Sequence, residues 1–168
     1  MECDSAYIYR CHKALAAMNA PMEGWFCTGV RDHGVDSFTC QLCGCKRVRY
    51  IHVMRHVAYL GFLEVGCICA GVMEGDILAA KERDAEAKRR SQRKSHYLKK
   101  TWNAVGENRW RTLYKRKEII IWQEQFCGRT FFKIDIDGEQ YHWKDNRRMT
   151  SFLIAQLYVF DLYKAEGT

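Results

Sequence analysis

The sequence predicts an α+β protein in which two small domains flank a long basic helix. Three observations indicate this fold class. Two close pairs of cysteines enclose two β-prone runs in the first half of the chain. A stretch of about two dozen residues then consists largely of Ala, Glu, Lys and Arg without Gly or Pro, which is typical of a helix. From Trp102 onward, polar and apolar residues alternate with a period of two, the pattern of half-buried strands.

The N-terminal segment is expected to form a helix over residues 4–19, because apolar residues such as Cys11 and Leu15 recur at three-or-four spacing. Pro21 then breaks the chain, and residues 31–37 are expected to form a loop. We expect the helix to cover one side of the module that follows, since so small a module has too little core to be stable alone.

The two cysteine pairs are the strongest chemical signal in the chain. The first pair is Cys40 and Cys43, and the second is Cys67 and Cys69. A C-x2-C turn lets two sulfurs converge on one ion, and zinc prefers a tetrahedral shell of thiolates and imidazoles. The sequence therefore predicts one structural Zn²⁺ bound by these four cysteines.

The identity of the fourth zinc ligand remains open, because C-x-C is a less regular ligand spacing than C-x2-C. His52 and His56 share one face of the expected strand, so either could replace Cys67. Cys45 could compete as well. The alternative interpretation is that these cysteines are buried, reduced thiols. A disulfide framework is not expected, because the count of nine cysteines is odd and the others are scattered.

A cysteine knuckle, a hairpin and a helix that starts near the last cysteine follow one another in the order of a treble-clef or zinc-ribbon module. Residues 40–76 resemble treble-clef-like zinc modules of small uncharacterised bacterial and phage proteins, in which a C-x2-C-G knuckle precedes a hairpin ending in Val-Gly-x-x-Cys. The residues that carry this resemblance are Cys40, Cys43, Gly44, Val65, Gly66 and Cys69. The resemblance implies a zinc-binding accessory protein and favours Cys69 as a ligand.

Positive charge is concentrated in the middle of the chain. The chain has a formal charge of +7, and residues 81–117 contain fourteen Lys or Arg against four acidic residues. A local basic stripe attracts a phosphate backbone, an acidic protein face or an anionic membrane. The candidate residues for binding nucleic acid or a partner are Lys46, Arg47, Arg49, Arg89, Arg90, Arg93, Lys94, Lys99, Lys100, Arg109, Trp110 and Arg111.

The C-terminal region predicts four antiparallel strands, over residues 109–114, 118–123, 129–136 and 140–143, separated by turn residues. An apolar helix is expected over residues 150–164.

Alternation in the first of these strands places Trp110, Thr112 and Tyr114 on one face and Arg109 and Arg111 on the other. Exposed aromatic rings beside arginines are suited to stacking bases while holding phosphates. The alternative is that the aromatic rings form a core beneath the last helix.

We therefore expect three segments. Residues 1–76 form a helix plus a zinc-binding module, residues 77–101 a basic helical linker, and residues 102–168 a four-stranded meander with one helix. No apolar run approaches the roughly 20 residues that cross a bilayer, and the N-terminus lacks a basic leader. A cytoplasmic protein of a bacterial host cell, without membrane partners, is expected.

The function expected from these features is that of a zinc-stabilised, non-enzymatic nucleic-acid-binding accessory protein of phage or mobile-element type. One alternative is a phage-encoded, anti-CRISPR-like inhibitor that uses the same basic surface to bind a host defence complex. A second alternative is a treble-clef nuclease. The nuclease needs a second His or Asn on the helix after the hairpin, and none follows Cys69 before His96.

Overall fold

The computed structural model describes residues 5–163, which contain four helices and several antiparallel sheets. The chain divides into two compact units, Met1–Gln92 and Arg93–Thr168, each with its own apolar core. Helix α3 (Ile77–Leu98), expected as a separate linker, instead contributes Ala80 to the first core and Tyr97 to the second.

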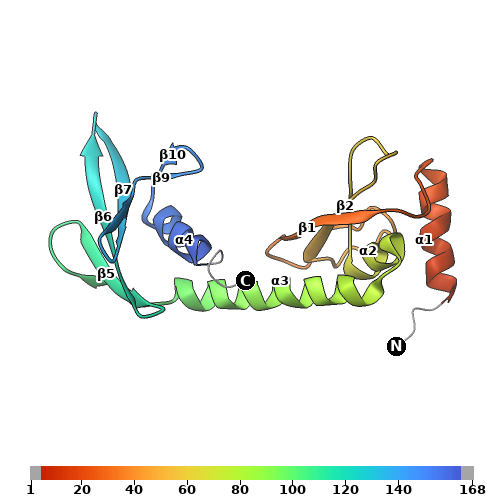
Figure 1. Cartoon of the computed structure of the whole chain (residues 1–168), viewed down its shortest axis with the longest axis horizontal. Helices are drawn as coiled ribbons and strands as arrows, with labels where there is room; N and C mark the ends of the chain where they lie inside the picture. Colours follow the sequence, from red (N-terminus) through yellow and green to blue (C-terminus); the bar gives the residue numbers. More distant parts are fainter. Residues whose placement is uncertain (1–4, 164–168) are drawn as a thin grey trace. The chain divides into compact units, whose positions relative to one another are not determined.

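The first unit joins helices to a three-stranded antiparallel sheet (Figure 1). Its elements in chain order are α1 (Ser5–Ala17), β1 (Phe26–Asp32), β2 (Tyr50–Arg55), β3 (Leu63–Val65), α2 (Cys67–Glu74) and the start of α3. The expected N-terminal helix, the β2–β3 hairpin and the helix after it are all confirmed. Helix α1 packs on α2, as expected of a helix that covers the module.

Strand β1 was not expected, and the prediction of a loop over residues 31–37 was wrong in its first two positions. The strand pairs along β2 from Phe26 opposite Arg55 to Asp32 opposite Tyr50. A bulge between Cys27 and Gly29 interrupts its register, and most of its side chains are exposed. An exposed, bulged strand has no apolar alternation by which its sequence could be recognised.

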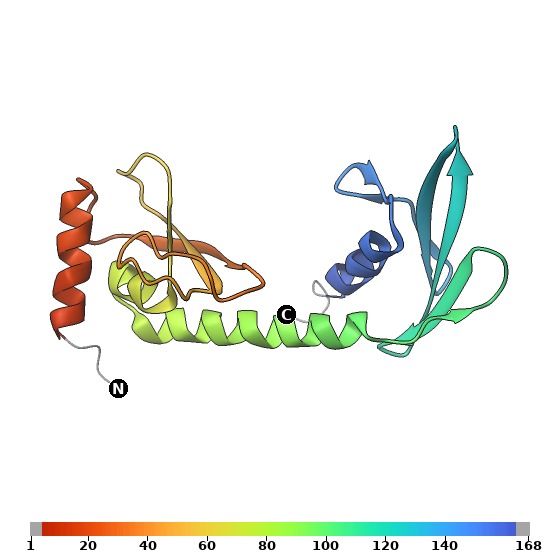
Figure 2. The same ribbon diagram turned by 180° about the vertical axis from the view of Figure 1, so that it is seen from behind.

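A close approach of two helices fixes the start of α3. A Cβ placed on Gly71 of α2 would lie 2.5 Å from the Cα of Ile77, so only glycine allows this contact. Asp76 caps α3, because its Oδ1 accepts a hydrogen bond from the Ala79 amide at 2.9 Å. Figure 2 shows α2 lying against the beginning of α3.

The second unit is a five-stranded meander with one helix. Its sheet has the order β4-β5-β6-β7-β8, followed by a two-stranded ribbon and α4. The bounds are β4 (Asn103–Ala104), β5 (Arg109–Tyr114), β6 (Lys117–Phe126), β7 (Arg129–Ile136), β8 (Glu139–Tyr141), β9 (Trp143–Lys144), β10 (Arg147–Arg148) and α4 (Phe152–Leu162). The four expected strands are present, and the short β4 makes the sheet five-stranded instead of four-stranded.

Helix α4 covers one face of this sheet. Phe152 at its start packs edge-on against Trp110 of β5, with ring centroids 5.1 Å apart, and against Phe132 of β7. Ser151 caps the helix, because its hydroxyl accepts a hydrogen bond from the Ile154 amide at 3.2 Å. The face that carries Trp110 is therefore the core face, and the opposite face of the sheet is not covered by α4.

Candidate metal centre

Three thiols of the first unit converge on one point. Cys40 and Cys43 come from the knuckle before β2, Cys69 comes from α2, and their sulfur atoms all lie within 4.8 Å of one another. The Cys40 and Cys69 Sγ atoms are 3.6 Å apart. Zinc–sulfur bonds of about 2.3 Å place two sulfurs of a tetrahedral site about 3.8 Å apart, close to this distance. The cluster could therefore hold a metal ion such as zinc.

The backbone around Cys40 is arranged to stabilise a thiolate. The Cys40 Sγ accepts hydrogen bonds from the Gly66 amide, at 3.3 Å, and from the Cys43 amide. The knuckle is closed by a hydrogen bond from the Gly44 amide to the Cys40 carbonyl at 3.0 Å, and Gly44 has a φ of 72°. Amide groups aimed at sulfur favour its charged form, the form that binds metal.

The sulfurs also oppose one another's ionisation. The hydrogen bond with Cys69, together with burial, raises the pKa of the Cys40 thiol far above its ordinary value. The contact with Cys11, together with burial, raises the pKa of the Cys69 thiol in the same way. Because buried thiolates repel one another, Cys40 and Cys69 become thiolates together only beside a cation, whereas Cys43 is exposed.

Helix α1 supplies two further groups at this cluster. The Tyr7 hydroxyl lies 3.0 Å from the Cys69 Sγ, and the Cys11 Sγ lies 3.9 Å from it. Burial and the neighbouring thiols raise the pKa of Tyr7, so its hydroxyl remains protonated. The sequence analysis did not assign either residue to the site. The signal was available in the i, i+4 spacing of Tyr7 and Cys11, which places both on one face of α1.

Cys67 belongs to a different cluster, so the structure does not bring it to the other three cysteines. Cys67 and Cys69 both lie within α2, where residues two apart point about 200° apart around the helix axis. The Cys67 Sγ instead gathers with His52 of β2 and Asp84 of α3, again within 4.8 Å of one another. Asp84 was not a sequence-predicted site residue.

His52 is completely buried and contacts groups through both ring nitrogens. Its Nε2 lies 3.4 Å from the Asp84 Oδ1, and its Nδ1 lies 3.9 Å from the Cys27 Sγ. Burial alone would lower the pKa of His52, but hydrogen bonds to Asp84, Cys27 and Cys67 together raise it to about 10. The other alternative ligand, His56, lies elsewhere. Its Nδ1 accepts a hydrogen bond from the Ala58 amide at 2.9 Å.

The sequence-predicted basic residues of the first unit differ in their partners and exposure. Arg49 is held by Asp32, at 3.0 Å, and by the Ser91 hydroxyl of α3, at 3.1 Å. Burial alone would raise the pKa of Asp32, but the hydrogen bond from Arg49 outweighs this effect and lowers the pKa to about 2. Arg89 pairs with Glu86. Lys46, Arg47 and Arg90 are exposed or partly exposed.

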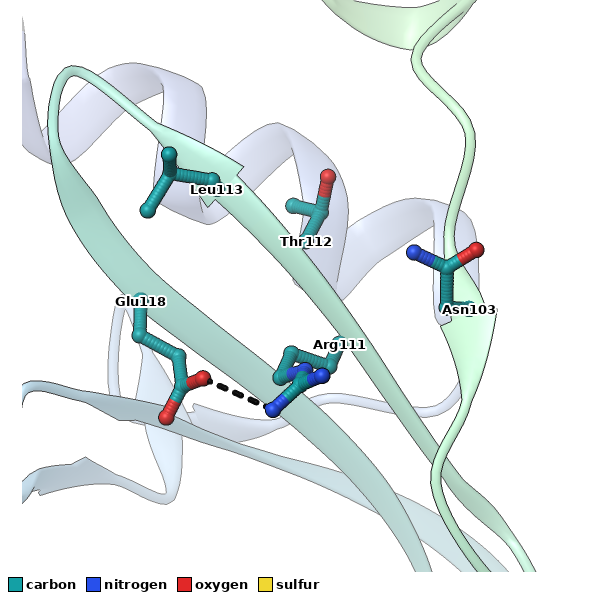
Figure 3. A pocket seen from close by; sticks show the side chains of 5 residues that line it. All are labelled: Asn103, Arg111, Thr112, Leu113 and Glu118. Carbon is teal, nitrogen blue, oxygen red and sulfur yellow. Dashed lines mark hydrogen bonds and ion pairs between the residues drawn. The ribbon is translucent and has the colours of Figure 1, made fainter.

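The sheet residues expected to bind nucleic acid are divided between two faces. Trp110 packs against the core beneath α4, and it is not an exposed stacking residue. On the uncovered face, the Arg109 guanidinium lies over the Trp122 ring at 6.0 Å. Arg111 pairs with Glu118 at 3.2 Å, inside the shallow pocket of about 360 Å³ drawn in Figure 3. Its charge is therefore already engaged.

The uncovered face of the sheet carries charges of both signs. Strand register and alternation place Arg109, Arg111, Arg129 and Lys133 on it, and Glu118, Glu124 and Asp135 beside them. Lys133 pairs with Glu124 at 2.7 Å.

The densest positive charge in the second unit lies where α3 ends. Tyr97 of α3 packs against Tyr114, with ring centroids 4.6 Å apart, and Tyr114 packs against Tyr163 at 5.3 Å. These contacts bring the basic turn between β5 and β6 next to the end of α3. The residues of this basic surface are Arg93, Lys94, Lys99, Lys100, Lys115, Arg116 and Lys117.

Comparisons with models of protein families, with curated proteins and with solved structures gave no match. Within residues 5–163, no helix is both long and apolar enough to span a membrane.

Proposed function

We propose that this chain is a zinc-stabilised nucleic-acid-binding protein, in which the first unit is held by metal and the second unit contacts phosphates. The single observation that carries the proposal is the basic surface defined above. It contains seven Lys or Arg from two segments and no acidic residue within either segment.

The metal part of the proposal assigns a structural Zn²⁺ to Cys40, Cys43 and Cys69, with Cys11 as the fourth ligand. Three thiols lie within 4.8 Å of one another, and the Cys11 Sγ lies 3.9 Å from that of Cys69 but outside this group. A shift of α1 toward the knuckle would bring Cys11 into a closed four-ligand site. Tyr7 then donates a hydrogen bond to the Cys69 sulfur from outside the coordination shell. The order of knuckle, hairpin and helix is that of a treble clef.

The distribution of charge between the units supports the nucleic-acid part. The second unit contains fifteen Lys or Arg against nine Asp or Glu, so it accounts for +6 of the formal charge of +7. The uncovered sheet face carries four Lys or Arg against three acidic residues, so most of the excess belongs to the end of α3 and to the β5–β6 turn. A dense group of flexible Lys and Arg side chains binds a phosphate backbone without specificity for the nucleobases.

The backbone of the β5–β6 turn supports the same interpretation. Lys115 and Arg116 have φ values of 49° and 66°, a conformation that favours Asn and Gly at both positions of a two-residue hairpin turn. Lys and Arg in these two positions adopt this backbone conformation at an energetic cost. Lys115 has a structural contact, because its Nζ donates to the Tyr163 carbonyl at 3.2 Å, whereas Arg116 is exposed.

The experiment compares two charge-reversal variants of the full chain. The test variant changes Lys94, Lys99 and Arg116 to Glu. The control variant makes the same change of net charge at three exposed positions outside the proposed surface, Lys13, Lys81 and Arg129.

Affinity for a fluorescent single-stranded and a duplex oligonucleotide is measured at several salt concentrations. We expect the test variant to lose about three phosphate contacts and its salt slope to fall by about 3, at roughly one per contact. The control variant should keep the wild-type slope. Equal losses in both variants would contradict a localised surface. Absence of binding by the wild type to every oligonucleotide at low salt would favour an acidic protein partner instead.

A further inference from the structure

We propose that the first unit contains a second metal site, in which His52, Cys67 and Asp84 bind a divalent zinc-type cation. This site is separate from the three-thiol cluster. It does not depend on the nucleic-acid function proposed above.

The ligand atoms come from three different elements that the fold brings together. His52 lies on β2, Cys67 on the first turn of α2 and Asp84 on α3, and one ligand atom from each lies within 4.8 Å of the other two. Zinc bonds of about 2.0–2.2 Å to nitrogen and oxygen place those two atoms about 3.3–3.5 Å apart in a tetrahedral site. The observed separation of His52 Nε2 and Asp84 Oδ1 is 3.4 Å.

The surroundings of His52 select the ring nitrogen that faces the ion. The Cys27 Sγ lies 3.9 Å from Nδ1, on the side of the ring opposite Asp84. A metal-binding histidine ordinarily has such a partner on its other nitrogen, which fixes the ring orientation. Cys27 is itself anchored, because its thiol donates to the Gly29 carbonyl at 3.4 Å. Cys27 lies at the β1 bulge, where the register shifts between Cys27 and Gly29.

The donor set indicates which metal the site would take. One imidazole nitrogen, one thiolate sulfur and one carboxylate oxygen suit zinc, whereas Mg²⁺ and Ca²⁺ prefer oxygen ligands alone. Three protein ligands leave the fourth tetrahedral position for water. His52 is completely buried, but the side chain of Asp84 is 32% exposed, so solvent reaches the site from the α3 side.

The expected consequence is a metal link between α3 and the sheet of the first unit. Arg49 provides a polar link between them, because it joins Asp32 of β1 to Ser91 of α3.

The test counts zinc in the full chain, purified without chelator. We expect two zinc ions per chain in the wild type and one in Asp84→Asn and in Cys67→Ser. A matched control, Glu82→Gln, removes an exposed carboxylate of the same helix outside the cluster and should retain both ions. The retained zinc of the three-thiol site reports that each variant is folded.

Cobalt substitution gives an independent readout. The three-thiol site should dominate the near-ultraviolet thiolate-to-cobalt absorption, and Asp84→Asn should remove only the weaker, one-thiolate contribution. One zinc in the wild type, unchanged by Asp84→Asn, would overturn the proposal and leave His52 and Asp84 as a buried ion pair. Loss of both ions from Asp84→Asn would overturn the independence of the two sites.

Discussion

Replacing Gly71 with alanine tests how closely packing and metal binding are coupled in the first unit. The added Cβ would lie 2.5 Å from the Ile77 Cα and 3.0 Å from its Cγ1. The first of these atoms is backbone, so no rotamer change relieves the contact, and the start of α3 must move away from α2.

The magnitude follows from two opposing effects. Overpacking of a close helix contact costs about 1–3 kcal/mol. Alanine recovers up to about 1 kcal/mol over glycine in a helix. We expect a net loss of about 1–2 kcal/mol in the free energy of unfolding of the first unit. For a unit of this size that lowers its Tm by roughly 4–16 °C.

The displacement of α3 should also affect zinc binding at the two metal sites differently. Asp84 lies about two turns beyond Ile77 along α3. Moving the start of α3 shifts Asp84 relative to Cys67, whereas the three-thiol cluster contains no α3 residue. Gly71→Ala should therefore weaken the second site and leave zinc in the first.

The assay combines calorimetry with zinc analysis of the full chain. Gly29→Ala is the matched control, because a Cβ at Gly29 has no neighbour within 4 Å, and its effect should stay within about 0.5 kcal/mol. A Gly71→Ala variant as stable as the wild type would refute the argument that α2 and α3 touch here. A destabilised variant that retains two zinc ions would refute the coupling to Asp84.

Two further predictions concern the cores of the two units. Cys11→Ser should greatly reduce zinc affinity at the three-thiol site, whereas Tyr7→Phe should cost only about tenfold, because it removes a hydrogen bond outside the coordination shell. Competition with a chromophoric chelator measures both, and equal losses would exclude Cys11 as a ligand. Tyr97→Phe should stabilise the second unit by up to about 1 kcal/mol, because the Tyr97 hydroxyl is buried without a hydrogen-bond partner among the described residues. Burial raises the pKa of Tyr97 above its ordinary value of 10.0. The unfolded chain therefore releases this proton first as the pH rises above 10, and stability falls there. Unfolding curves at pH 9 and 11 should show a smaller fall for Tyr97→Phe, and a larger one would contradict this reasoning.

The sequence predicted the features that are local in the chain. The knuckle at Cys40 and Cys43, the hairpin and the meander all depend on spacings of a few residues, and each is present. The spacing of Cys67 and Cys69 was misinterpreted, because the helix begins at Cys67 and turns the two sulfurs apart.

The rest depended on contacts between residues far apart in the chain. Asp84 is 32 residues from His52, and it lies in a helix whose composition is that of a solvated surface. Nothing local distinguishes this aspartate from the exposed Glu82 two positions earlier. The ion pair between Arg111 and Glu118 likewise could not be predicted, because only the pairing of β5 with β6 brings the two side chains together.

The salt dependence of oligonucleotide binding by the wild-type chain tests the central claim most directly. The basic surface offers seven Lys or Arg, among which Lys115 donates to the Tyr163 carbonyl and Lys117 lies over the Tyr163 ring. If about five of the others contact phosphates, the slope of log K against log salt should be roughly −4.5 for duplex and −3.5 for single strands. A slope near zero, with measurable binding, would contradict phosphate recognition by this surface.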